Sequence, residues 1–178
     1  MNGVKDLYII LLTGMMFFFT GNAVAKDLVS RHATITYSHK DDLRAFNNEL
    51  YMGRLRSRIQ TNRGDTLEDE VITKINFIVE KVMTALDMSL PQLTFSIMIH
   101  PDERAVHQDF RRLYNVDVDY IAFYSPSRNR VFYSADNARL RVVAHEIGHV
   151  VAENYFTISP PQRIHEVLAQ FAEQHVMD

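Results

Sequence analysis

The sequence predicts one α+β domain in which a small, mostly antiparallel β-sheet packs on a long helix. Runs rich in β-branched and aromatic residues, at 33–37, 93–99 and 120–133, alternate with longer segments of helical periodicity. The composition, 47% hydrophobic and 23% charged, is that of a soluble domain with a substantial core. The sequence contains no internal repeat or low-complexity segment that would indicate a second domain.

Residues 1–25 are predicted to be a secretory signal peptide, which leaves residues 26–178 as the domain. Lys5 precedes the apolar run 7–19, and Ala23-Val24-Ala25 has the small-x-small pattern of a cleavage site. The apolar run is short for a bilayer span, so an uncleaved anchor is the less favoured alternative. We therefore expect an exported protein with no stable membrane anchor after cleavage.

The net charge and the cysteine content limit which partners and which cellular compartment we expect for this protein. The net charge is −3, so the chain has no positive excess that would attract nucleic acid. There is no cysteine, and an exported domain without disulfides depends on its core alone. Small secreted eukaryotic domains are usually rich in disulfides, which favours a bacterial periplasm or the extracellular medium.

A strand and a helix are the first elements expected in the domain. Residues 33–37 are β-branched and aromatic, as in strands. Residues 41–57 carry apolar side chains at helical spacing, namely Leu43, Phe46, Leu50 and Leu55. His32 and His39 flank the strand and are expected to lie at the surface or to form hydrogen bonds rather than bind metal.

A long amphipathic helix is predicted after a loop at 61–64. Asp65 would be its N-cap, with Glu68 three residues later. Apolar residues then recur at steps of three or four, namely Leu67, Val71, Ile75, Ile78, Val82 and Leu86. This helix is expected to pack across the sheet and to contribute core.

A strand, a helix and a hairpin are predicted next. Apolar and polar residues alternate over 93–99, which indicates a strand with one buried face. The Pro-Asp-Glu segment at 101–103 opens a helix to Tyr114, with His100 and His107 as structural residues. Residues 120–133 form a hairpin whose turn contains Ser, Pro and Asn.

The strongest functional signal is the segment His145-Glu146-Ile147-Gly148-His149. On a helix, histidines four residues apart leave the same face one turn apart and can bind one Zn²⁺, with Glu146 placed to act on a water molecule. The flanking residues are uncharged, so the helix is expected to be buried. Buried imidazoles and a carboxylate need partners, and a divalent metal satisfies all three. A pair of structural core histidines is the alternative.

A hydrolytic zinc needs a third protein ligand and an open fourth position. The segment Ser159-Pro160-Pro161-Gln162 predicts the start of another helix, with Ser159 as N-cap, so a short loop would join two antiparallel helices. At 1.5 Å per residue, His149 lies about 8 Å before that turn and Glu166 about 10 Å after it. Glu166 is therefore the predicted third ligand, and Ala169 would let the helices approach closely.

With these residues the chain resembles the gluzincin branch of the zincin metallopeptidases. In that branch two histidines of HExxH and a glutamate from a following helix hold the zinc. The residues that carry the resemblance are His145, Glu146, His149 and Glu166, with Ala169 and Gln170 after them, within residues 119–175. The resemblance implies a zincin-like fold with an active-site helix, a ligand helix and one zinc ion per chain. Thermolysin-type enzymes have Asp where this chain has Gln170, which is more like the Asn of ImmA/IrrE-type proteins.

The resemblance also implies roles for residues around the metal. Gluzincins bind an extended peptide along the strand ahead of the metal helix, so Ala122, Phe123 and Tyr124 would line the substrate groove. An ordinary hairpin that covers the core is the alternative. Gluzincins place a Tyr or His near the developing oxyanion, and Tyr155 and His165 are the candidates nearest in sequence.

The predicted function is zinc-dependent hydrolysis of a peptide or protein substrate, with Glu146 as general base. Gln170 and Glu173 are candidates to orient the ligating imidazoles. Two alternatives stay open. One is a non-catalytic zinc-binding domain, an inactive peptidase-like protein or metal buffer, which would have no use for Glu146. The other is a hydrolase of cell-wall peptide cross-links, which the sequence does not separate from a protease.

Overall fold

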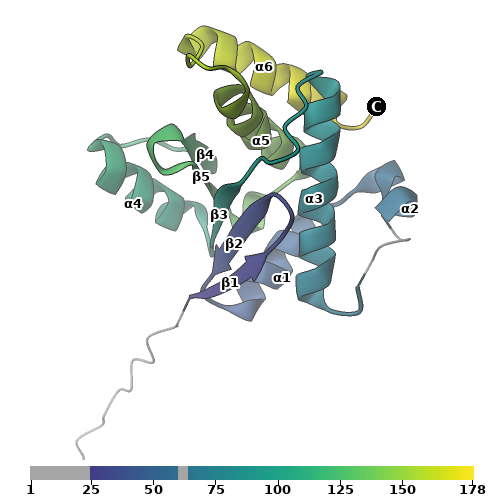
Figure 1. The fold of residues 1–178 in the computed structure, drawn as a ribbon. Coiled ribbons are helices and arrows are strands. Elements are labelled where there is room, and N and C mark those ends of the chain that lie inside the picture. Colours follow the sequence, from purple (N-terminus) through teal and green to yellow (C-terminus); the bar gives the residue numbers. More distant parts are fainter. Residues whose placement is uncertain (1–24, 60–63) are drawn as a thin grey trace, which may run out of the picture.

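The computed structural model describes residues 25–59 and 64–178 and has an α+β architecture built on one five-stranded sheet (Figure 1). The strand order is β1-β2-β3-β5-β4, so β1 and β4 are the edge strands. The strands are β1 (Lys26–Val29), β2 (Ala33–Tyr37), β3 (Phe95–His100), β4 (Ala122–Ser125) and β5 (Arg130–Ser134). The bounds of β2 are those predicted from the sequence.

The sheet is mixed, and the prediction of a mostly antiparallel sheet was wrong. The pairs β1–β2 and β4–β5 are antiparallel, whereas β2–β3 and β3–β5 are parallel. Parallel neighbours need a crossover connection, usually a helix. The helices between β2 and β3, and the helix between β3 and the hairpin, provide those crossovers.

Helices cover both faces of the sheet (Figure 1). The helices are α1 (Lys40–Glu49), α2 (Arg56–Ile59), α3 (Leu67–Ala85), α4 (Glu103–Tyr114), α5 (Leu140–Tyr155) and α6 (Gln162–His175). The main core joins one sheet face to α1, α3 and α5. A smaller cluster joins the other face to α4 through Val106, Phe123 and Phe132. The long helix and the helix to Tyr114 are confirmed.

Two helix boundaries differ from the prediction. The helix expected over 41–57 ends at Glu49, and the chain then turns at Gly53, which has a φ of +50°, a left-handed conformation that suits glycine. The long helix is capped by Thr66 rather than Asp65, since Asp69 N donates to Thr66 Oγ1 at 3.1 Å. Residues 1–24, on which the predicted signal peptide rests, and loop residues 61–63 lie outside the described residues.

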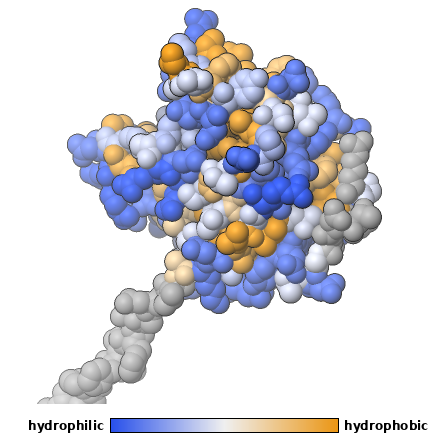
Figure 2. Space-filling view, viewed as in Figure 1, coloured by the Kyte–Doolittle hydropathy of each residue, from blue (hydrophilic) through white to orange (hydrophobic). Residues whose placement is uncertain are grey.

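The surface in the view of Figure 1 is mostly hydrophilic, with apolar side chains gathered in patches, one of them over α6 (Figure 2). Three exposed apolar residues of α6 are Ile164, Val167 and Phe171. No helix in the described part of the chain has the length and apolar character that a membrane-crossing segment requires.

Candidate metal centre

Helix α5 is buried on most sides, as the uncharged flanks of its motif predict. Val143, Ile147 and Val150 are fully buried against the sheet and α3. Val143 also accepts a hydrogen bond at its carbonyl from the buried Tyr133 hydroxyl, at 3.1 Å. This contact fixes the first turn of α5 on β5, two residues before the first histidine of the motif.

Helix α6 runs antiparallel to α5 and approaches it closely at Gly148. A Cβ atom added at Gly148 would lie 2.9 Å from Ala169 Cα and 3.2 Å from Ala172 Cβ. Small residues on both helices therefore allow backbone contact, as predicted for Ala169. The start of α6 was predicted wrongly: the helix begins at Gln162, after Pro161, and Ser159 does not cap it.

The close approach brings His145, His149 and Glu166 together. His145 Nε2 lies 3.7 Å from Glu166 Oε2, and His149 Nε2 lies 3.7 Å from Glu166 Oε1. One ligand atom from each residue falls within 4.8 Å of the other two. The predicted convergence of the three side chains is therefore seen.

The spacing of these atoms suits a small tetrahedral cation. With bonds of about 2.0–2.1 Å, two ligand atoms in a tetrahedral zinc site lie about 3.3 Å apart. The two 3.7 Å separations from Glu166 are slightly longer than that value, and all three ligand atoms lie within 4.8 Å of one another, so the side chains would move closer together around a bound ion. Two imidazoles and one carboxylate also form a common donor set of hydrolytic zinc sites.

The electrostatic environment keeps His149 uncharged at neutral pH. Burial and the neighbouring His145 lower the pKa of His149 to about 4. Its imidazole thus has a free lone pair, and this neutral form is the one that binds a metal.

Glu146 lies beside the cluster and is 8% exposed. Burial, reinforced by the charge of Glu166, raises the pKa of Glu146 to about 8, while a hydrogen bond from the main-chain N–H of Tyr124 opposes the shift. A cation held by the three neighbouring residues would favour the ionised carboxylate and oppose the shift further. Glu146 thus interacts with Glu166 of the cluster and, through the main chain of Tyr124, with the edge strand β4.

Glu173 orients one imidazole, whereas Gln170 does not. Glu173 Oε2 lies 3.2 Å from His145 Nδ1, which turns Nε2 of that ring toward Glu166. Gln170 is exposed, so the site geometry gives no support to its predicted role. Glu173 comes seven residues after Glu166, so its side chain leaves the helix within about 20° of the direction of Glu166. Gln170 comes four residues after Glu166, and its direction differs by about 40°.

Of the two candidate oxyanion stabilisers, only His165 lies at the site. Tyr155 is 46% exposed and packs on Phe156, since it comes six residues after His149, about 120° around the helix. The site geometry therefore gives no support to the predicted role of Tyr155. His165 Nε2 lies 3.0 Å from Glu153 Oε2 and 3.3 Å from Ser159 Oγ, and its ring centroid is 5.9 Å from that of His149.

A cavity of about 700 Å³ opens onto the cluster. One side is formed by the α5 and α6 residues described above, and the other by β4, including the predicted groove residues Ala122, Phe123 and Tyr124. The volume lies within the range of ligand sites and exceeds what a few water molecules need. The cavity is thus large enough to admit part of a peptide.

Sequence reasoning missed the aromatic residues that complete this cavity. Phe110 and Tyr114 of α4, and Tyr120 in the segment before β4, also line it. The signal that could have indicated them is the i, i+4 aromatic pair at the end of α4, followed by another tyrosine near the edge strand.

The Gly148 contact leads to the first testable prediction. Replacing glycine by alanine inside a helix normally stabilises it by about 1 kcal/mol. In Gly148→Ala the new methyl would overlap the α6 backbone, and overpacking of this kind costs about 1–3 kcal/mol. We expect a lower free energy of unfolding in urea, together with weaker zinc binding because α6 carries Glu166. An increase in stability would contradict the close approach.

Comparisons of the chain with models of protein families, with curated protein sequences and with solved structures find no match. The functional conclusion therefore depends on the geometry of the site itself.

Proposed function

We propose that this protein is a zinc-dependent peptidase with a zincin-like fold. The observation that supports it best is the convergence of His145, His149 and Glu166 beside the buried carboxylate of Glu146, at the mouth of a cavity bordered by an edge strand. His145, His149 and Glu166 would hold one zinc ion. When bound, zinc would supply Lewis-acid activation of a water molecule and of the substrate carbonyl.

The chain's own residues would then complete the reaction. Glu146 would take the proton of the attacking water and pass it to the nitrogen of the leaving amine. Glu173 would hold the His145 ring in its ligating orientation. His165 lines the cavity near His149, and it would donate a hydrogen bond to the carbonyl oxygen of the substrate once its Nε2 leaves Glu153.

The open edge of β4 offers the substrate a place to bind. Ile121 O accepts a hydrogen bond from Ser134 N at 3.0 Å, so main-chain groups of the next residue, Ala122, and of Tyr124 point away from β5. The hydrogen bond from Tyr124 N–H to Glu146 agrees with this direction. An extended peptide on this edge would place its backbone beside Glu146 and the metal ligands.

Chelator-sensitive cleavage of a mixed peptide library by the purified protein would test this proposal. New amino termini that appear with zinc and disappear after chelation would support a peptidase. A protein that holds zinc and cleaves nothing would favour the non-catalytic zinc-binding alternative. Cleavage confined to cell-wall cross-link peptides, added to the same assay, would favour the cell-wall hydrolase.

Glu173→Gln provides a second testable prediction. The neutral amide is a weaker acceptor for His145 Nδ1–H, so the imidazole loses both orientation and basicity. Zinc affinity is expected to fall about 10–100-fold, measured by competition with a chelating dye. Gln174→Ala, at the exposed neighbour, is the control and should bind zinc as the unmodified protein does.

A further inference from the structure

An aromatic wall, formed by Phe110, Tyr114, Tyr120 and Phe123, lines the same cavity as the metal ligands. Phe110 is its centre: its ring centroid lies 4.7 Å from that of Tyr114, 5.2 Å from Tyr120 and 5.0 Å from Phe123. The last two pairs are edge-to-face, a favoured geometry for aromatic rings. No ionisable acid or base belongs to the wall apart from the two phenols.

The wall is fixed in place, although part of it faces solvent. The Tyr114 hydroxyl donates to Ser125 Oγ at 2.7 Å, which ties the end of α4 to β4. Phe123 stacks on Phe132 of β5, with ring centroids 4.5 Å apart. Even so, Tyr114 is 39% exposed and Tyr120 is 49% exposed. Exposed aromatic surface on a rigid support, inside a cavity, is typical of a binding site rather than of core.

The two faces of β4 present different chemistry to a bound strand. Ala122 and Tyr124 belong to the α5 face of the sheet, and Phe123 points to the α4 face. Successive side chains of an added strand alternate between those faces. A peptide on the edge would therefore place one side chain toward the metal ligands and the next against the aromatic wall.

We propose that the aromatic wall is a specificity pocket that selects peptides with an aromatic side chain next to the scissile bond. This inference rests on the proposed function. An aromatic ring would add offset or edge contacts to Tyr120 and Phe110 and would remove their exposed surface from water. An acidic or amide side chain would lose its hydration there without gaining a charged partner from the wall.

Binding of two peptide hydroxamates to the zinc-loaded protein tests the proposal without requiring turnover. The compounds differ only in one side chain, benzyl or methyl, next to the hydroxamate, and their Kd values are measured by calorimetry. We expect the benzyl compound to bind about tenfold more tightly. In Tyr120→Ala this preference should fall to within about threefold, because the most exposed ring of the wall is removed.

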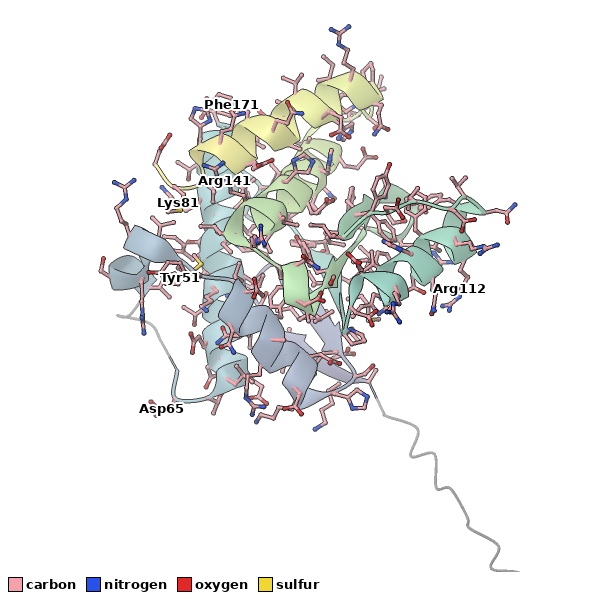
Figure 3. All side chains as sticks on the ribbon, turned by 180° about the vertical axis from the view of Figure 1, so that it is seen from behind. Tyr51, Asp65, Lys81, Arg112, Arg141 and Phe171 are labelled. Carbon is pink, nitrogen blue, oxygen red and sulfur yellow. The ribbon has the colours of Figure 1, made fainter. Side chains whose placement is uncertain are left out.

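Two variants serve as controls. Tyr120→Phe keeps the ring and should keep the preference. Tyr51→Ala removes a tyrosine that is 70% exposed. Tyr51 lies across the molecule from Arg112 of α4 (Figure 3), so this variant should also keep the preference for the benzyl compound. Zinc content and thermal midpoint are measured for each variant, so that loss of metal or of folding is seen separately from loss of selectivity.

The outcomes separate the two proposals. A protein that holds zinc and binds both hydroxamates equally would overturn the aromatic wall as a specificity pocket and would leave the metal centre in place. A preference that survives in Tyr120→Ala would also overturn it. A protein that holds no zinc would overturn the proposed function and, with it, the inference drawn from that function.

Discussion

Glu146→Gln is expected to keep zinc and to lose turnover. The amide has nearly the same volume as the carboxylate, so the buried space beside Tyr124 stays filled and the three ligands are untouched. What is lost is the group that accepts the proton of water. General acid–base groups contribute about 10²–10⁴-fold to rate, and kcat is expected to fall within that range. Initial cleavage rates and metal analysis of the same preparation measure both effects.

Glu80→Gln is the matched control for that experiment. Glu80 is an exposed residue of α3 that pairs with Arg31, so its replacement should change neither zinc content nor turnover. Loss of zinc in Glu146→Gln would show that Glu146 acts as a ligand, and unchanged turnover would show that another group accepts the proton. Either result would contradict the role assigned to Glu146.

Glu166→Ala is expected to lose zinc. Its carboxylate oxygens are the atoms of α6 that face Nε2 of both motif histidines, so its removal leaves only two ligands on α5. Removing a group that merely supports a ligand weakens binding about 10–100-fold, and removing a ligand should exceed the upper end of that range. A dye-competition titration measures the affinity of the variant against the unmodified protein.

Gln174→Ala again serves as the control, because it shortens an exposed side chain on the same helix. Helical content by circular dichroism shows whether α6 still forms in Glu166→Ala. A folded Glu166→Ala protein with unchanged zinc affinity would contradict the ligand assignment, whatever the cleavage assay shows.

Much of the local structure could be predicted because periodicity and spacing are local properties of the chain. The β-branched and aromatic residues of 33–37 and the apolar stripe of α3 predicted elements close to those observed. The meeting of His149 and Glu166 followed from helix rise and a short connecting loop alone. The distance between residues on two helices joined by a short loop depends mainly on helix rise and loop length.

The remaining features depend on three-dimensional packing. The strand order, with β3 between β2 and β5, is set by which helix crosses which face, and no local pattern encodes it. The prediction for Tyr155 was made from sequence distance without rotation around the helix, and its side chain is exposed beside Phe156. The aromatic wall joins α4 to the edge strand through Tyr114 and Ser125, a contact that no spacing within a single element indicates.

The central claim is that His145, His149 and Glu166 form a zinc site, and metal analysis of the purified protein tests it most directly. The protein is dialysed against zinc, freed of excess metal, and measured by elemental mass spectrometry beside Glu166→Ala. We expect one zinc per chain in the unmodified protein and a clear loss in the variant. Absence of zinc from the unmodified protein, or equal zinc in both, would contradict the claim.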